Sequence, residues 1–187
     1  MRAFSILATV TAFALSVNAA SQNKRAISDN VQSCINNLTT SNAKLLELTS
    51  AVNSFTSASG YAGATAIHNT EQALEALLKT TNTACCATTT TVSNEEASAV
   101  FGLVADIVPD ITGSLDAIIA KKSDFAAVAF ATAIVKTDVK ALSVLLKTLD
   151  GCLIAVTPEA LLASAQAYID TIDAKFVQAF TTYGITA

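Results

Sequence analysis

The sequence has little charge, few turn-forming residues and one histidine. Charged residues make up 14% of its 187 residues, and it contains six glycines and two prolines. No arginine follows Arg25, so the chain beyond that point has eight lysines against fifteen acidic residues, a net charge of −7. A negative chain without arginine is poorly suited to bind the phosphate backbone of a nucleic acid, so no nucleic-acid partner is expected.

Catalytic patterns are equally scarce. The sequence has no G-x-S-x-G nucleophile elbow and no glycine-rich phosphate loop. Acidic pairs such as Asp106 with Asp110 lie at helical spacing, which is common by chance on an acidic helical protein. The sequence therefore predicts a protein that is not an enzyme and needs no cofactor.

His68 is a candidate ligand for a metal site. Glu71 and Glu75 share its helical face, but the sequence offers no second histidine and no neighbouring cysteine as a zinc ligand. A solvated or salt-bridged histidine is the simpler interpretation, and no metal site is predicted.

The N-terminus is typical of an exported protein. Arg2, an apolar run from Ala3 to Val17 and the small residues before position 20 predict a signal peptide at residues 1–19. Residues 20–25 form a candidate pro-segment that ends in the dibasic pair Lys24-Arg25, with an exposed linker as the alternative. Residues 26–187 form the mature domain, in which no transmembrane span is expected. We expect a secreted protein, extracellular or in the cell wall.

Apolar residues make up 52% of the chain and recur every three or four residues, which predicts an all-α fold. We expect a single bundle of about five long helices, at about 29–55, 62–82, 94–120, 123–149 and 158–180. Ser93 and Glu96 form a capping box for the third helix, and Pro109 should kink it. Residues 39–42 are a weak point of the first helix, and the threonine-rich residues 80–91 should fray the second. Asp150-Gly151 should end the fourth helix, and Thr157 should cap the fifth.

Four cysteines, Cys34, Cys85, Cys86 and Cys152, allow three disulfide pairings. A bond between the adjacent Cys85 and Cys86 is sterically awkward. We therefore expect two disulfides that staple the bundle, Cys34 with one of the adjacent pair and Cys152 with the other. A reactive or metal-binding pair is the alternative.

Together, these features make the chain similar to the fungal hydrophobic surface-binding protein family, which overlaps the cell-wall galactomannoproteins. The similarity rests on the secretory start, the opening Ile27-Ser28-Asp29, the helices rich in Ala, Thr and Ser, the segment 106–109 and the closing helix 165–180. It implies a secreted, non-enzymatic bundle that adsorbs to hydrophobic surfaces, some members enclosing fatty acids between their helices.

Frequent alanines can leave internal space between long helices, because they fill little volume. Apolar side chains of four helices are the candidates to line a groove or cavity for a lipid. They are Leu74, Leu77, Phe101, Val104, Ile107, Val128, Val135, Leu142, Ile169, Ile172 and Phe176. Each of them could equally be an ordinary core residue.

Two other functions stay open at this stage. A structural wall mannoprotein would bind no ligand and would carry an N-glycan on Asn37 and O-glycans on the threonine runs. A secreted effector is the other alternative. A secreted hydrolase or a cell-wall polysaccharide is a further candidate partner.

Overall fold

The computed structural model describes residues 27–186, so the predicted signal peptide (1–19) and pro-segment (20–25) lie outside the described residues. The described chain is helical, without strands. Its elements are α1 (Asp29–Ser54), η1 (Ser57–Ser59), α2 (Gly60–Cys85), α3 (Asn94–Ala120), α4 (Lys122–Ala126), α5 (Ala131–Val156) and α6 (Glu159–Tyr183). The prediction of an all-α bundle with five long helices is confirmed.

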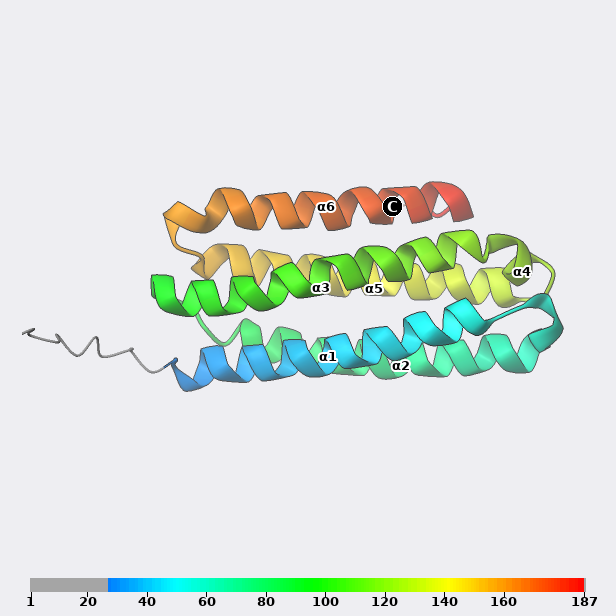
Figure 1. Ribbon diagram of the computed structural model, residues 1–187, viewed down its shortest axis with the longest axis horizontal. Helices are drawn as coiled ribbons and strands as arrows, with labels where there is room; N and C mark the ends of the chain where they lie inside the picture. The colour runs from blue at the N-terminus through cyan, green and yellow to red at the C-terminus, as the bar shows by residue number, and fades with distance from the viewer. Residues whose placement is uncertain (1–26, 187) are drawn as a thin grey trace, which may run out of the picture.

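The five long helices form a closed ring. α1 packs against α2 and α3, α2 against α5, α5 against α6, and α6 against α3. Figure 1 shows all five along one axis, with α1, α3 and α6 running in one direction and α2 and α5 in the other. Because no helix occupies the axis of this ring, side chains alone must fill its centre.

The capping box of α3 is confirmed. The Ser93 hydroxyl accepts a hydrogen bond from the Glu96 amide, and the Glu96 carboxylate accepts one from the Ser93 amide. The same carboxylate accepts a bond from the Ser28 amide at 3.0 Å. These bonds, chiefly those from Ser28, lower the pKa of Glu96 to about 2. α3 then continues through Pro109 to Ala120.

The predicted weak point in α1 is absent, because the helix is continuous through residues 39–42. The predicted fraying of α2 is confirmed in part: the helix includes Thr80, Thr81 and Thr83 but ends at Cys85, within the threonine-rich stretch. The hydroxyls of Thr39, Thr81 and Thr83 each donate to the carbonyl oxygen four residues earlier. Inside the helix these bonds satisfy the hydroxyls that would otherwise compete with helical structure.

The predicted fourth helix, residues 123–149, is wrong in two places, because it is broken after Ala126 and continues beyond residue 149. α4 ends at Ala126, and a turn leads to Phe130, whose φ of 66° is left-handed. α5 then runs past Gly151 to Val156, because Leu149 and Val156 continue its buried face beyond the glycine. Thr157 does not cap α6, since its hydroxyl donates to the Leu153 carbonyl at 2.7 Å.

Both disulfides form, with the pairing Cys34–Cys85 and Cys86–Cys152. The first joins α1 to α2, and the second joins the end of α2 to α5. Since the four cysteines are all used in these two bonds, α3 and α6 carry no covalent staple.

Candidate functional site

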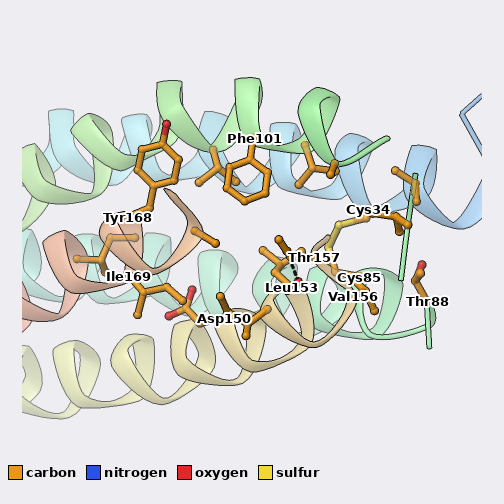
Figure 2. A pocket seen from close by; sticks show the side chains of 18 residues that line it. Cys34, Cys85, Thr88, Phe101, Asp150, Leu153, Val156, Thr157, Tyr168 and Ile169 are labelled. Carbon is orange, nitrogen blue, oxygen red and sulfur yellow. Dashed lines mark hydrogen bonds between the residues drawn. A yellow bond between two sulfur atoms is a disulfide. The ribbon is translucent and has the colours of Figure 1, made fainter. Parts of the chain in front are cut away.

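Two apolar cavities lie inside the ring. The first, here the disulfide-end cavity, has a volume of about 70 Å³ and is bordered by α1, α3, α5 and α6 beside the Cys34–Cys85 bond. Figure 2 shows the rings of Phe101 and Tyr168 facing each other across its α3–α6 side, with their centroids 6.1 Å apart. The second, here the central cavity, has a volume of about 90 Å³ and receives side chains from all five long helices.

The two cavities are neighbours. Four side chains border both of them: Val104 of α3, Asp150 and Leu153 of α5, and Ile172 of α6. We call these four the partition residues. Small movements of their side chains would change how the two spaces connect.

Eight of the eleven predicted lining residues border one or both cavities. The disulfide-end cavity is bordered by Phe101, Val104, Ile169 and Ile172, and the central cavity by Leu74, Val104, Ile107, Leu142, Ile172 and Phe176. The other three border neither. Leu77 is half-buried on α2, Val128 is buried in the turn after α4, and Val135 is buried on α5 beside a smaller cavity.

Two partition residues, Asp150 and Leu153, were absent from the predicted set. A fourth helix that ends at Asp150-Gly151, as predicted from the sequence, leaves Leu153 outside any helix. The signal that could have found Leu153 is its place on the stripe that starts at Leu142, Leu146 and Leu149 and needs only a helix that tolerates Gly151.

Asp150 is the one carboxylate or amine that borders either cavity among the described residues. No hydrogen bond to its carboxylate occurs within the described part of the chain. Burial, and to a lesser extent the nearby Asp173, raises its pKa to about 6. The apolar interior therefore contains one group that changes charge in mildly acidic solution.

His68 pairs with a carboxylate, as one of the two simple interpretations predicted, but its partner lies on another helix. Its Nδ1 is 3.0 Å and 3.1 Å from the two carboxylate oxygens of Asp138 on α5. Glu71 lies beside this pair and is 2% exposed. Burial and the charge of Asp138 raise the pKa of Glu71 to about 8.

The outer surface also has apolar features. Phe130 is 77% exposed and Tyr61 is 57% exposed, and they lie near the starts of α5 and α2, at the same end of the bundle (Figure 1). Asn37 is half-buried in α1, where its side-chain amide donates to the Ser33 carbonyl at 2.8 Å. No helix within residues 27–186 is both long and apolar enough to cross a membrane.

Residues 31–155 match the family model described as "Hydrophobic surface binding protein A". No curated protein matches the chain.

Several solved structures share the fold. AfMP4p in complex with palmitic acid is 26% identical, with a TM-score of 0.77, over 82% of this chain and 99% of that one. Ligand binding domain 2 of Penicillium marneffei MP1, in complex with arachidonic acids, is 16% identical, with a TM-score of 0.74, over 87% and 97%. Domain 1 of the same protein, also with arachidonic acids, is 17% identical, with a TM-score of 0.64, over 82% and 93%.

Proposed function

The chain belongs to the hydrophobic surface binding protein A family, and on this premise we propose that it holds the acyl chain of a fatty acid between its helices. The two apolar cavities that meet at the partition residues are the observation that carries the proposal. The solved structure of AfMP4p with palmitic acid, which shares this fold over nearly its whole length, supports the same class of ligand.

The acyl chain would lie along the axis of the ring and cross the partition. Each methylene removed from water contributes roughly 0.8 kcal/mol, so a chain of more than ten carbons would bind well without specific polar contacts. The Asp150 carboxylate would lie beside the chain, and its charge at neutral pH would oppose a fatty carboxylate in the same space.

The ring must widen to admit such a ligand. Its cavities of about 70 and 90 Å³ are smaller than the 300–1,000 Å³ of typical ligand sites. The disulfides hold α1, α2 and α5 together, whereas no disulfide holds α3 or α6 to another helix. We propose that α6, with or without α3, moves outward to open the path.

Adsorption to hydrophobic surfaces would use a different part of the molecule. The exposed rings of Phe130 and Tyr61 lie at one end of the bundle, near the exposed alanines 126, 127 and 129. We call this end the aromatic tip. An exposed aromatic residue with a left-handed backbone is unusual, and such outliers often serve a function rather than packing.

The two disulfides support action outside the cell, where such bonds persist. A non-catalytic role fits a family and solved structures that are described as binding proteins. The N-glycan on Asn37, and a hydrolase or wall polysaccharide as partner, stay predictions. The bond from the Asn37 amide to Ser33 inside α1 argues against an occupied glycan.

A matched pair of tryptophan variants tests the proposed cavity ligand. Val104→Trp would fill the partition, whereas Val177→Trp adds the same bulk at a position that is 61% exposed. Native mass spectra of the mature protein mixed with palmitate should show a one-to-one adduct for the wild type and for Val177→Trp. The adduct should be lost in Val104→Trp, with an unchanged far-ultraviolet circular dichroism spectrum confirming its fold. Equal adducts in the two variants would refute lipid binding at the partition.

A further inference from the structure

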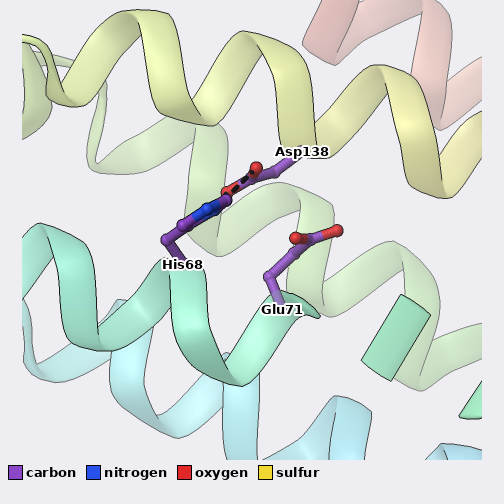
Figure 3. Close-up of side chains that lie close together, drawn as sticks. All are labelled: His68, Glu71 and Asp138. Atoms are coloured by element: carbon purple, nitrogen blue, oxygen red, sulfur yellow. Dashed lines mark hydrogen bonds and ion pairs between the residues drawn. The ribbon is translucent and has the colours of Figure 1, made fainter. Parts of the chain in front are cut away.

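The structure brings together three metal-ligating side chains that are far apart in sequence. His68 and Glu71 lie one turn apart on α2, and Asp138 faces them from α5 (Figure 3). One donor atom from each residue, the histidine nitrogen and two carboxylate oxygens, lies within 4.8 Å of the others. The sequence placed only Glu71 and Glu75 on the face of His68 and offered no further histidine or cysteine, so it predicted no metal site. The packing of α2 against α5 adds the Asp138 carboxylate.

One oxygen of this group has no hydrogen-bond partner. Glu71 is 2% exposed, and its Oε2 accepts a bond from Gln72 at 2.9 Å. Its Oε1 is fully buried and has no hydrogen-bond partner among the described residues. A buried carboxylate oxygen without a partner is costly, so a proton, a water or a cation is needed to stabilise it.

Buried carboxylates gather at this site, and the lysines beside Glu75 are Lys79 of α2 and Lys136 and Lys140 of α5. Asp138 is 6% exposed and Glu75, one turn beyond Glu71, is 9% exposed. Glu75 pairs with Lys79, whose side chain is 63% exposed, and His68 pairs with Asp138. The remaining neighbours, from α1, α3 and α4, are apolar and include Leu48, Ile118 and Phe125. No lysine amine or second imidazole from these helices faces the Glu71 carboxylate.

We propose that His68, Glu71 and Asp138 bind a divalent first-row metal ion such as Zn²⁺. One imidazole and two carboxylates form a donor set that such ions accept, with water completing the shell. Ligands about 2.1 Å from an ion are roughly 3.0 Å apart when cis in an octahedron and 3.4 Å apart in a tetrahedron. The 3.0 Å separation of His68 Nδ1 and Asp138 Oδ1 matches this spacing, and a Glu71 oxygen lies within 4.8 Å of both atoms, so that a side-chain movement would complete the set.

The ion has a route into the site and a structural consequence. The His68 side chain is 33% exposed, so the site opens to solvent on the histidine side. A bound ion would join α2 to α5 towards the end of the bundle opposite the Cys86–Cys152 bond. α2 and α5 would then be cross-linked by the disulfide at one end and by the metal ion towards the other. None of its three ligands is a partition residue, so the metal-site proposal does not depend on whether a lipid binds at the partition.

The single histidine of the chain makes the test direct. Untagged mature protein, labelled with ¹⁵N and freed of metal by chelation, is titrated with ZnCl₂ while the imidazole nitrogens are followed by NMR. We expect a saturable one-to-one change in the His68 Nδ1 resonance. Zinc that binds without shifting that resonance, or no saturable binding, would overturn the proposal and leave a proton or a buried water as the partner of Glu71.

Isosteric variants then locate the other ligands. Glu71→Gln and Asp138→Asn keep the side-chain volumes but remove the charge, whereas Glu95→Gln does the same at an exposed position on α3. The zinc dissociation constant from calorimetry should rise by at least about tenfold in the first two variants and stay unchanged in the third. Equal affinities in Glu71→Gln and Glu95→Gln would refute the site.

Discussion

The Asp150→Asn variant tests the electrostatics of the apolar interior. The wild-type carboxylate has a pKa of about 6 in the folded protein, above the ordinary value of 3.8. Between these two values the folded state binds more protons than the unfolded state, so this group lowers the stability as the pH rises through that window. A difference of about two pKa units corresponds to about 3 kcal/mol, and the partial exposure of Asp150 makes this an upper bound.

The expected result is a pH-dependent gain from the asparagine. At pH 7.5 the variant should be more stable than the wild type by up to about 3 kcal/mol, and at pH 4 by at most about 0.5 kcal/mol. Urea unfolding, followed by circular dichroism at both pH values, measures the difference, and other acids that titrate in this range cancel between the two proteins. Asp170→Asn, at an exposed position of α6, serves as the control and should show no such pH dependence. An equal effect of Asp150→Asn at pH 4 and pH 7.5 would refute the burial argument.

Other variants test the aromatic tip, the disulfides and the attachment of α6. Phe130→Gly should weaken adsorption to hydrophobic beads about tenfold or more. The stability of the protein should stay equal or rise by up to about 1 kcal/mol, because glycine suits the positive φ at this position. Unchanged adsorption would show that the aromatic tip is not the adsorbing surface. Replacing Cys34 and Cys85 by alanine should cost about 4 kcal/mol in urea unfolding, since the bond closes a loop with a sequence separation of 51; a loss below 1 kcal/mol would contradict this. Tyr183→Phe removes the 2.7 Å bond to the Ile118 carbonyl that attaches α6 to α3 and should cost about 1 kcal/mol. That loss should come with faster amide exchange in the last turns of α6, and unchanged exchange would argue against this anchor.

The periodicity of apolar residues was enough to predict five long helices, and the number and positions of the cysteines were enough to predict two disulfides. The periodicity failed where local residue preferences and tertiary packing disagree. Gly151 is a common helix terminator, but Leu149, Leu153 and Val156 bury the face that carries α5 past it. The helix propensity of a single residue is a weak guide to where a helix ends when the following turn buries further apolar side chains in the core.

The break at residues 127–130 could not be predicted for the opposite reason. Its residues, Ala-Val-Ala-Phe, include no proline or glycine, and next to the break Phe125 is buried against Phe55, with ring centroids 4.5 Å apart. Such long-range packing leaves no local signal. The grouping of Asp138 with His68 depends in the same way on how α2 and α5 pair around the ring, which the pattern of one helix does not contain.

The central claim is that a fatty acid lies inside the ring across the partition. Methyl-labelled protein with bound ¹³C-palmitate tests it through intermolecular nuclear Overhauser effects. The account predicts contacts from the acyl chain to the methyl groups of Val104, Leu153 and Ile172. Contacts confined to outward-facing methyl groups such as those of Val144 and Val177, which are 57% and 61% exposed, would contradict it and place the lipid on the outside of the bundle.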